Sequence, residues 1–157
     1  MLIGLISDTH GLLRSEAIAA LRDCDLILHA GDIGAPEIID QLRAIAPVHA
    51  IRGNVDTGSW AAAFPETMLV ETAAALIYML HDVNQLALDP AAAGAQIVLS
   101  GHSHKPSRTE RNGVLYLNPG SAGPRRFNLP VTVARLELSA EPWTFELIDL
   151  TQVREQN

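Results

Sequence analysis

The sequence of 157 residues is poor in cysteine, in positive charge and in long apolar runs. Its single cysteine, Cys24, excludes an internal disulfide framework. Eleven Lys and Arg stand against eighteen Asp and Glu, and the formal net charge of −7 argues against general binding to nucleic acid or to anionic membranes. No uncharged apolar stretch approaches the ~18 residues that a membrane-spanning helix needs. These absences predict a compact, acidic, cytoplasmic protein.

The first residues do not read as a secretory signal. Residues 1–6 are apolar, but Asp8 follows at once, and there is neither a basic flank nor a small-residue cleavage site. We therefore interpret them as a buried strand. The sequence contains no internal repeat, low-complexity segment or Pro/Gly/Ser-rich linker, so residues 1–157 are expected to form a single domain.

Strand and helix patterns alternate through the first third of the chain. Ser15 is the expected N-cap of the first helix, and Pro36 suits the first turn of the second. This order predicts right-handed βαβ units around a mainly parallel sheet, an α/β fold. Strands are expected at residues 2–7, 26–30 and 48–52, and helices at residues 15–22 and 36–44.

The second half is richer in strands. A helix is expected at residues 84–94, and residues 120–130 are expected to form the longest loop. The segments 131–138 and 143–150 alternate between apolar and polar residues, which predicts a hairpin. Further strands are expected at residues 67–71, 74–80, 96–100 and 114–117.

Five polar clusters lie where the expected strands end. In open α/β sheets ligands bind beyond the carboxyl ends of the strands, so these clusters are expected to meet in one crevice. The clusters are Asp8-Thr9-His10-Gly11, Gly31-Asp32, Gly53-Asn54-Val55-Asp56, His81 and Gly101-His102-Ser103-His104.

The clusters supply carboxylate, amide and imidazole ligands but no thiolate. Such a set suits Mn²⁺, Fe, Ni²⁺ or Zn²⁺ better than Mg²⁺ or an iron–sulfur cluster. The candidates outnumber the ligands of one ion, so two ions sharing one carboxylate fit better, with Asp32 as the natural bridge. Such a pair, about 3.5–4 Å apart, clamps the attacking and leaving oxygens of a displacement at phosphorus. The candidate ligands are Asp8, His10, Asp32, Asn54, His81, His102 and His104.

Each cluster taken alone also has a structural interpretation. Asp8 and His10 fit a capped turn, and Asp32 and Asn54 are common turn residues. Two further histidines, His29 and His49, are not expected to be ligands: His29 is interpreted either as buried and hydrogen-bonded or as supporting the ligands from behind, and His49 as structural. Asp82 is expected to be solvated.

In their order and spacing, the motifs Asp-x-His, Gly-Asp, Gly-Asn-x-Asp, a lone His after a strand and Gly-His-x-His resemble the calcineurin-like metallophosphoesterase superfamily. Asp-Thr-His-Gly near the start and Asn118-Pro119-Gly120-Ser121 are similar to its small bacterial and archaeal phosphodiesterase branch, of the YfcE type. The resemblance runs from Met1 to about Leu150. It implies a four-layer αββα sandwich.

The resemblance also implies a ligand set and a reaction. Its two divalent transition-metal ions would be manganese first, with nickel, zinc or iron as alternatives. The implied activity is hydrolysis of a small or activated phosphodiester by in-line attack of a metal-bound hydroxide, without a phosphoenzyme. One ion would be held by Asp8, His10, Asp32 and His104, and the other by Asp32, Asn54, His81 and His102.

Other residues are predicted to serve the reaction around the ions. Asn54 and Asp56 are the predicted catalytic residues, with Asp56 either orienting Asn54 or a ligating histidine, or simply capping a turn. Ser121 and Arg125, together with Arg126, are predicted to contact the phosphate of a small phosphate-ester substrate, since Arg offers a bidentate fork.

Two positions depart from the family pattern. Many members have His after Gly-Asn, and this branch usually has Cys, whereas the chain has Val55, which can neither stabilise the transition state nor protonate a leaving group. The branch's His-Gly-His reads His81-Asp82-Val83 here. Both departures affect how the substrate is handled rather than the ligand set.

Two other functions compete with the enzyme. One is a non-catalytic interaction scaffold like the eukaryotic retromer subunit Vps29, which has an incomplete ligand set; the intact ligands argue against it and Val55 argues weakly for it. The other is a nuclease, which is disfavoured because only Arg125-Arg126 is locally basic. Residues 60–64 are interpreted as a flap over the site or as an oligomer contact, which leaves a homo-oligomer open.

Overall fold

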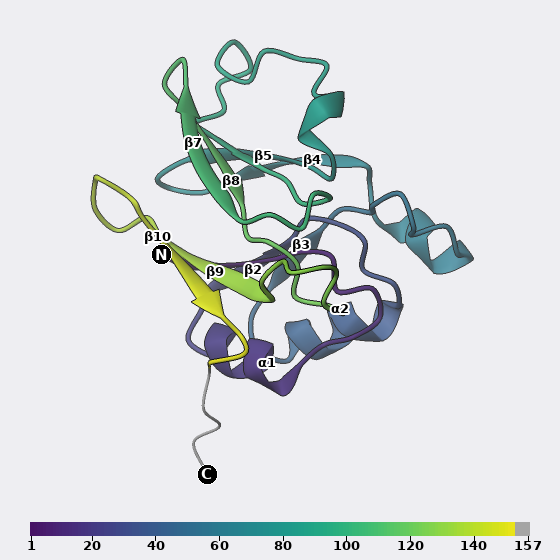
Figure 1. The fold of residues 1–157 in the computed structure, drawn as a ribbon. Coiled ribbons are helices and arrows are strands. Elements are labelled where there is room, and N and C mark those ends of the chain that lie inside the picture. The colour runs from purple at the N-terminus through teal and green to yellow at the C-terminus, as the bar shows by residue number, and fades with distance from the viewer. Residues whose placement is uncertain (153–157) are drawn as a thin grey trace.

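The computed structural model describes residues 1–152, which form two five-stranded sheets packed face to face with two α-helices on the outer face of the first (Figure 1). The first sheet has the order β10-β9-β1-β2-β3, and the second has the order β4-β5-β6-β8-β7. In the first sheet three neighbouring strands are parallel and an antiparallel hairpin extends the sheet on one side. In the second sheet the three central strands are parallel and both edge strands are antiparallel to their neighbours.

The elements of the first sheet come from both ends of the chain. Its strands are β1 (Leu2–Ile6), β2 (Leu26–His29), β3 (Val48–Ala50), β9 (Thr132–Glu137) and β10 (Thr144–Asp149). Its covering helices are α1 (Ser15–Leu21) and α2 (Pro36–Arg43). The predicted hairpin is confirmed, because β9 and β10 pair antiparallel over six residue pairs.

The second sheet is built from the middle of the chain. Its strands are β4 (Thr67–Glu71), β5 (Leu76–Leu80), β6 (Ile97–Leu99), β7 (Ser107–Arg111) and β8 (Val114–Asn118). Two 3₁₀ turns, η1 (Ser59–Ala63) and η2 (Val83–Gln85), precede β4 and follow β5.

The side chains on the two faces of the first sheet belong to two different hydrophobic cores. Ile3 and Leu5 of β1 face the second sheet and pack with Ile77, Met79 and other residues of its inner face. The remaining face contacts α1 and α2 through Ile6 and Ile27. This period-two alternation is what places one sheet between the helices and the other sheet.

The α/β sandwich class is confirmed, and its fourth layer is thin. The outer face of the second sheet packs Tyr78 and Val98 against Val83 and Leu86, which belong to η2 and the segment after it. Among the described residues no α-helix lies on that face.

Four expectations about the elements are wrong. The helix at 84–94 is replaced by η2 and a turn, because Pro90 disfavours helical backbone at Asp89, whose Oδ1 instead accepts the Ala91 N–H at 3.1 Å. Ser15 is not an N-cap, since that position belongs to Arg14. The sheet expected to be mainly parallel is mixed, because β9 pairs antiparallel with β1 and β10 pairs antiparallel with β9. The fourth error is the omission of β7, whose five residues are all exposed.

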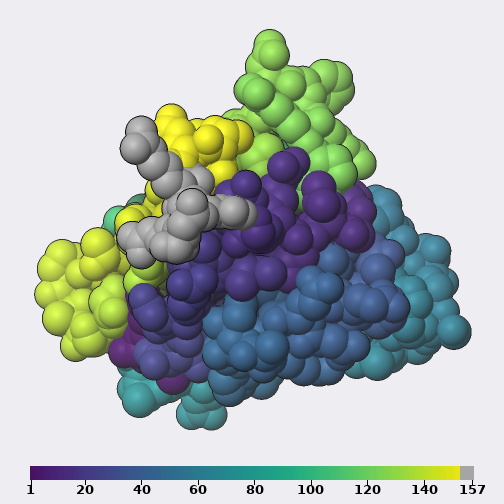
Figure 2. Space-filling view, turned by 90° about the horizontal axis from the view of Figure 1, so that it is seen from below, coloured from purple at the N-terminus to yellow at the C-terminus, as the bar shows by residue number. Residues whose placement is uncertain are grey.

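The longest loop lies between β8 and β9, as predicted. Its residues project as a green ridge in the space-filling view (Figure 2), and Phe127 near its tip is 92% exposed. No helix within residues 1–152 is long and apolar enough to cross a membrane.

Candidate functional site

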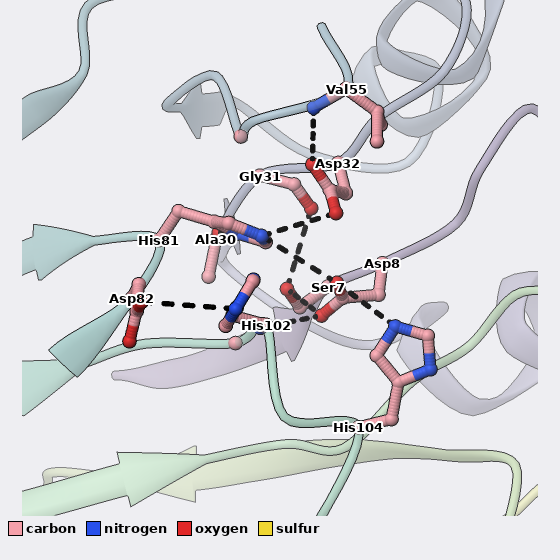
Figure 3. A network of polar contacts seen from close by, with 12 residues as sticks. Ser7, Asp8, Ala30, Gly31, Asp32, Val55, His81, Asp82, His102 and His104 are labelled. Atoms are coloured by element: carbon pink, nitrogen blue, oxygen red, sulfur yellow. Dashed lines mark hydrogen bonds and ion pairs between the residues drawn. The ribbon is translucent and has the colours of Figure 1, made fainter. Parts of the chain in front are cut away.

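The polar clusters predicted from the sequence follow strands of both sheets. Asp8 follows β1, Asp32 follows β2 and Asn54 follows β3, whereas His81 follows β5 and the Gly101–His104 turn follows β6. Because β1 to β3 are parallel to one another, as are β5 and β6, each sheet delivers its clusters at one edge. The side chains then contact one another (Figure 3).

Backbone conformation marks these turns as unusual. Positive φ angles are rare outside glycine and persist only where the surrounding structure enforces them. Five of the seven candidate ligands have one: Asp8 (56°), His10 (48°), Asp32 (54°), His102 (69°) and His104 (61°). Such strain concentrated on ligand candidates indicates a site whose geometry is held at the expense of local stability.

Two glycines allow the loops to approach the carboxylates. A Cβ at Gly53 would collide with Oδ1 of Asp32, and one at Gly101 would collide with Oγ of Ser7 and lie 2.6 Å from Oδ2 of Asp8. The glycine in each motif is therefore needed for close approach of backbone to carboxylate.

Asp8 lies at the centre of the cluster and is fully buried. Its Oδ2 accepts hydrogen bonds from Ser7 Oγ at 2.7 Å and from the His102 backbone N–H at 3.1 Å. Its Oδ1 faces three imidazole nitrogens, Nε2 of His104 at 3.3 Å and Nε2 of His10 and His81 at 3.8 Å each.

Asp32 connects the two halves of the cluster. Its Oδ1 accepts the Val55 backbone N–H at 3.1 Å, whereas its Oδ2 lies 3.2 Å from Nε2 of His81 and 3.6 Å from Nε2 of His10. Asp32 therefore lies between His10 and His81, and its role as a bridge between two ions stays a prediction.

The tautomer of His81 follows from its hydrogen bond. Its Nδ1 lies 2.7 Å from the Ala30 carbonyl oxygen, and because a carbonyl can only accept, Nδ1 carries the proton. Its Nε2 then presents a lone pair to the carboxylates. An outer ring nitrogen bonded to a backbone carbonyl is the usual arrangement of a metal-ligating histidine.

The ligand atoms form two adjacent groups. One group consists of Asp8, His10 and His104, and the other consists of Asp32, His81 and His102. Within each group the ligand atoms lie within 4.8 Å of one another. The rings are close, with centroids 5.4 Å apart for His10 and His104 and 5.2 Å apart for His81 and His102.

Three buried atoms without hydrogen bonds indicate that a cation would fit among the candidate ligands. Oδ1 of Asp8, Nε2 of His10 and Nε2 of His81 make no hydrogen bond with any residue from 1 to 152. A buried carboxylate oxygen and imidazole lone pairs aimed at one another are costly unless a cation lies between them. The donor set, oxygen and nitrogen without sulfur, suits divalent transition metals.

The charges of the cluster shift its pKa values in both directions. Burial lowers the pKa of His10, and the nearby Arg126 and His104 add to this, while Asp32 and Asp8 only partly oppose it. Burial would also lower the pKa of His81, but its close contact with Asp32 and its hydrogen bond to the Ala30 carbonyl outweigh burial and raise it. For Asp32, burial raises the pKa, and the contacts with His81 and the Val55 N–H overcome this and hold it below its usual value.

A pocket of about 350 Å³ opens beside the second group. Asn54, which is exposed and follows β3, lines it together with His81 and His102. Its other walls carry Arg52, Gly53, Glu66, Thr67, Leu80, Asp82 and Gln85. Arg52 is fixed there, because it donates to the Phe64 carbonyl oxygen at 2.6 Å and lies 3.2 Å from Glu66.

Three predicted site residues lie elsewhere or bond differently. The carboxylate of Asp56 accepts the backbone N–H groups of Ile33, Gly34 and Gly53 at 3.0, 2.9 and 2.8 Å, so it ties two ligand loops together. Ser121 is buried and donates to the Asp8 carbonyl oxygen at 3.1 Å. Arg125 is exposed and donates to the Leu129 carbonyl oxygen within its own loop.

Arg126 is the basic residue of that loop whose charge reaches the cluster, as the pKa of His10 indicates. Asp82 is not simply solvated as expected, because its Oδ2 lies 3.7 Å from Nε2 of His102. The signal for this in the sequence is that Asp82 departs from the family's His-Gly-His pattern.

His29 is buried and hydrogen-bonded, which is one of the two roles predicted for it. It is fully buried, its Nδ1 accepts the Gly31 N–H at 3.1 Å, and its Nε2 therefore donates to Thr9 Oγ1 at 2.9 Å. Thr9 Oγ1 in turn donates to the Ile33 carbonyl oxygen at 2.8 Å. Burial holds the pKa of His29 down to about 4, so the ring is neutral.

Asn118 is a supporting residue that sequence reasoning placed only within a motif. Its Nδ2 donates to the Gly101 carbonyl oxygen at 2.9 Å and lies 3.2 Å from Ser103 Oγ. Its Oδ1 accepts the Gly120 N–H at 2.9 Å. Asn118 therefore fixes the turn that carries His102 and His104 to the loop after β8.

Comparisons with known proteins agree with the site. A family model described as a calcineurin-like phosphoesterase superfamily domain matches residues 1–141. A probable metallophosphoesterase of Methanothermobacter thermautotrophicus is 36% identical over 160 residues, covering 94% of this chain and 92% of its own.

Two solved structures share the fold. Vacuolar Protein Sorting 29 from Cryptosporidium parvum superposes with a TM-score of 0.81 at 23% identity, over 98% of this chain and 92% of its own. A structure reported as a novel archaeal phosphodiesterase gives a TM-score of 0.78 at 23% identity, over 94% and 100%.

Proposed function

The chain belongs to the calcineurin-like phosphoesterase superfamily, and on that premise we propose that it is a dinuclear phosphodiesterase acting on a small or activated phosphodiester. The observation that carries the proposal is the convergence of orphaned ligand atoms. Oδ1 of Asp8 and Nε2 of both His10 and His81 are buried, lack hydrogen bonds within the described chain and lie within 3.8 Å of a carboxylate or imidazole partner.

The residues divide between two divalent cations that share Asp32. Two such cations would supply a nucleophilic water near neutral pH and charge to stabilise the transition state at phosphorus. Manganese is the proposed metal, with nickel, zinc or iron as alternatives. Asp8, His10, Asp32 and His104 would hold one, and Asp32, Asn54, His81 and His102 the other.

The rest of the chain positions these ligands and admits the substrate. Four side chains fix the ligand loops by hydrogen bonds to the backbone: those of His29, Asp56, Asn118 and Ser121. Hydrolysis adds the oxygen of water to phosphorus and breaks one ester bond, which releases an alcohol and a phosphomonoester. The 350 Å³ pocket beside Asn54 and His102 offers room for one arm of the diester.

Val55 limits the choice of leaving group. Its backbone N–H is used by Asp32, and its side chain is 45% exposed but apolar, so it has no proton to give. The alcohol must therefore leave without help from this position, and esters with good leaving groups are the expected substrates. Of the basic side chains, Arg126, whose charge lowers the pKa of His10, is the candidate for a phosphate contact.

Hydrolysis of bis-(p-nitrophenyl) phosphate tests the proposal. The purified protein with added Mn²⁺ should release p-nitrophenolate, and EDTA should abolish the release. Asp32→Asn should lower metal content and turnover together, whereas Asp40→Asn, the same change at an exposed position of α2, should leave both intact. Absence of turnover on any activated diester by the metal-loaded protein would contradict the proposal.

A scaffold remains the second candidate because Val55 removes a proton donor and the Vps29 structure shares the fold. Turnover separates the two. Two firmly bound ions without hydrolysis would favour the scaffold, and hydrolysis that disappears in Asp32→Asn would exclude it.

A further inference from the structure

His102 is the least restrained of the four candidate ligand histidines. Its side chain is 43% exposed, whereas those of His10, His81 and His104 are 14%, 8% and 6% exposed. It also has a positive φ of 69°, which only its surroundings can maintain. An exposed imidazole loses rotational freedom when it binds an ion, so something must orient it.

Asp82 is placed to do so. It is the N-cap of η2, and its Oδ1 accepts the Asn84 N–H at 3.0 Å, which fixes the carboxylate. Its Oδ2 lies 3.7 Å from Nε2 of His102, and Figure 3 shows the two side chains facing each other at the edge of the cluster. Its side chain is only 20% exposed.

The same pattern already exists at the other histidine of this group. His81 is oriented because its outer nitrogen, Nδ1, donates to the Ala30 carbonyl oxygen. A neutral imidazole has one N–H and one lone pair, so an acceptor at one nitrogen makes the other the ligand. At His102 the neighbouring acceptor is Asp82, and it faces Nε2.

We propose that Asp82 is a positioning residue that holds the Nε2 proton of His102 and leaves Nδ1 as a ligand for the second cation. This inference rests on the metal assignment of the proposed function. At 3.7 Å the contact is electrostatic, and an ion bound at Nδ1 would strengthen it by polarising the N–H. Asp82, which directly follows His81 in the sequence, would thereby supply the orientation that the exposed His102 otherwise lacks.

Two substitutions separate the effect of the Asp82 carboxylate on His102 from the role of Asp82 as N-cap of η2. Asp82→Asn and Asp82→Ser both retain a good N-cap for η2, so the turn should fold in each. Ser is too short to reach His102, and Asn reaches it without the charge. Isothermal titration with Mn²⁺ in the absence of substrate should show the second ion binding about 10–100-fold more weakly in Asp82→Ser and by an intermediate factor in Asp82→Asn, with the first ion unchanged.

Asp89→Asn is the matched control. Asp89 lies in the same segment and caps a turn in the same way, through the Ala91 N–H, but it does not line the pocket. Equal binding of the second ion by wild type, Asp82→Asn and Asp82→Ser would overturn the inference while leaving the proposed function standing. An equal loss in Asp89→Asn would overturn it as well, and a wild-type protein that takes up no second ion would overturn both.

Discussion

Oδ1 of Asp8 lies 3.3 Å from Nε2 of His104 and accepts no hydrogen bond from residues 1–152, although the side chain is fully buried. The same oxygen faces Nε2 of His10 and of His81. A buried carboxylate oxygen that faces imidazole nitrogens and accepts no hydrogen bond destabilises the folded chain, since no donor compensates the lost hydration of that oxygen. A cation bound beside Oδ1 would offset this cost.

Asp8→Asn should consequently change stability with opposite sign in the two metal states. The Asn carbonyl can accept from Ser7 and His102, and its NH₂ can donate to the imidazoles, so in EDTA the variant should be more stable than wild type by about 1–3 kcal/mol. In Mn²⁺ the wild type should be the more stable protein, because it alone keeps the full ligand set. Urea unfolding in both buffers measures this, and a variant less stable in EDTA would contradict it.

Asp56 was predicted to be catalytic, and Asp56→Asn tests whether its role is structural instead. Its carboxylate accepts three backbone N–H groups, and an amide oxygen can replace only part of that acceptor capacity. The free energy of unfolding should fall by about 2–3 kcal/mol. Both ions should bind more weakly, because the Asp32 and Asn54 loops lose their tie.

The control is Asp23→Asn, an exposed aspartate after α1. It should leave the stability and the metal affinity of the protein unchanged. If Asp56→Asn lowered kcat while stability and metal affinity stayed at wild-type values, Asp56 would act in the chemistry after all.

His29 should make stability depend on pH. Its native pKa of about 4 lies below its ordinary 6.5, so the unfolded chain takes up a proton first as the pH falls. The contribution of the neutral ring is complete above pH 6.5 and is lost between pH 6.5 and pH 4. The loss amounts to roughly 3 kcal/mol across that window.

Urea unfolding of wild type and His29→Gln in EDTA, at pH 7 and pH 4.5, checks this effect. Wild type should lose more stability than the variant on acidification, although the variant starts lower because its bonds to Thr9 and Gly31 are gone. His49→Gln, at an exposed position of β3, should keep the wild-type pH dependence. Parallel losses in wild type and His29→Gln would contradict a neutral buried His29.

Much of the fold followed from local signals. Pro36 begins α2 as predicted, and the alternation in β9 and β10 predicted their hairpin. Sheet membership could not be predicted in this way, because no local pattern reports that β1 pairs with β9 from the far end of the chain. β7 was missed because an exposed edge strand needs no apolar alternation.

The candidate site, like the fold, could be predicted from local motifs only in part. The seven candidate ligands were found because each motif lies at a strand end, and the structure gathers six of them into two groups and lines the adjoining pocket with Asn54. The partners of Ser121 and Asp56 could not be read from the sequence, since both bond to backbone in distant loops. A side chain's residue type does not indicate which remote N–H or carbonyl will lie beside it.

Val55 provides a test of how the missing proton donor shapes specificity. It follows Asn54 beside the pocket, its side chain is 45% exposed, and its N–H alone is used, by Asp32. A histidine at this position can keep that backbone bond and add a proton donor at the mouth of the site. Val55→His should therefore raise kcat for a diester with a poor alkyl leaving group, by up to about 10²-fold. With p-nitrophenolate, which needs no protonation to leave, kcat should change little.

Val55→Ala serves as the control, since it removes side-chain bulk without adding a donor. It should leave the ratio of the two kcat values at the wild-type level. A plot of log kcat against leaving-group pKa measures the effect directly: its negative slope should be steep in wild type and Val55→Ala and shallower in Val55→His. Equal slopes in all three proteins would mean that proton donation from this position does not limit the reaction, and that the leaving group departs with help from another group.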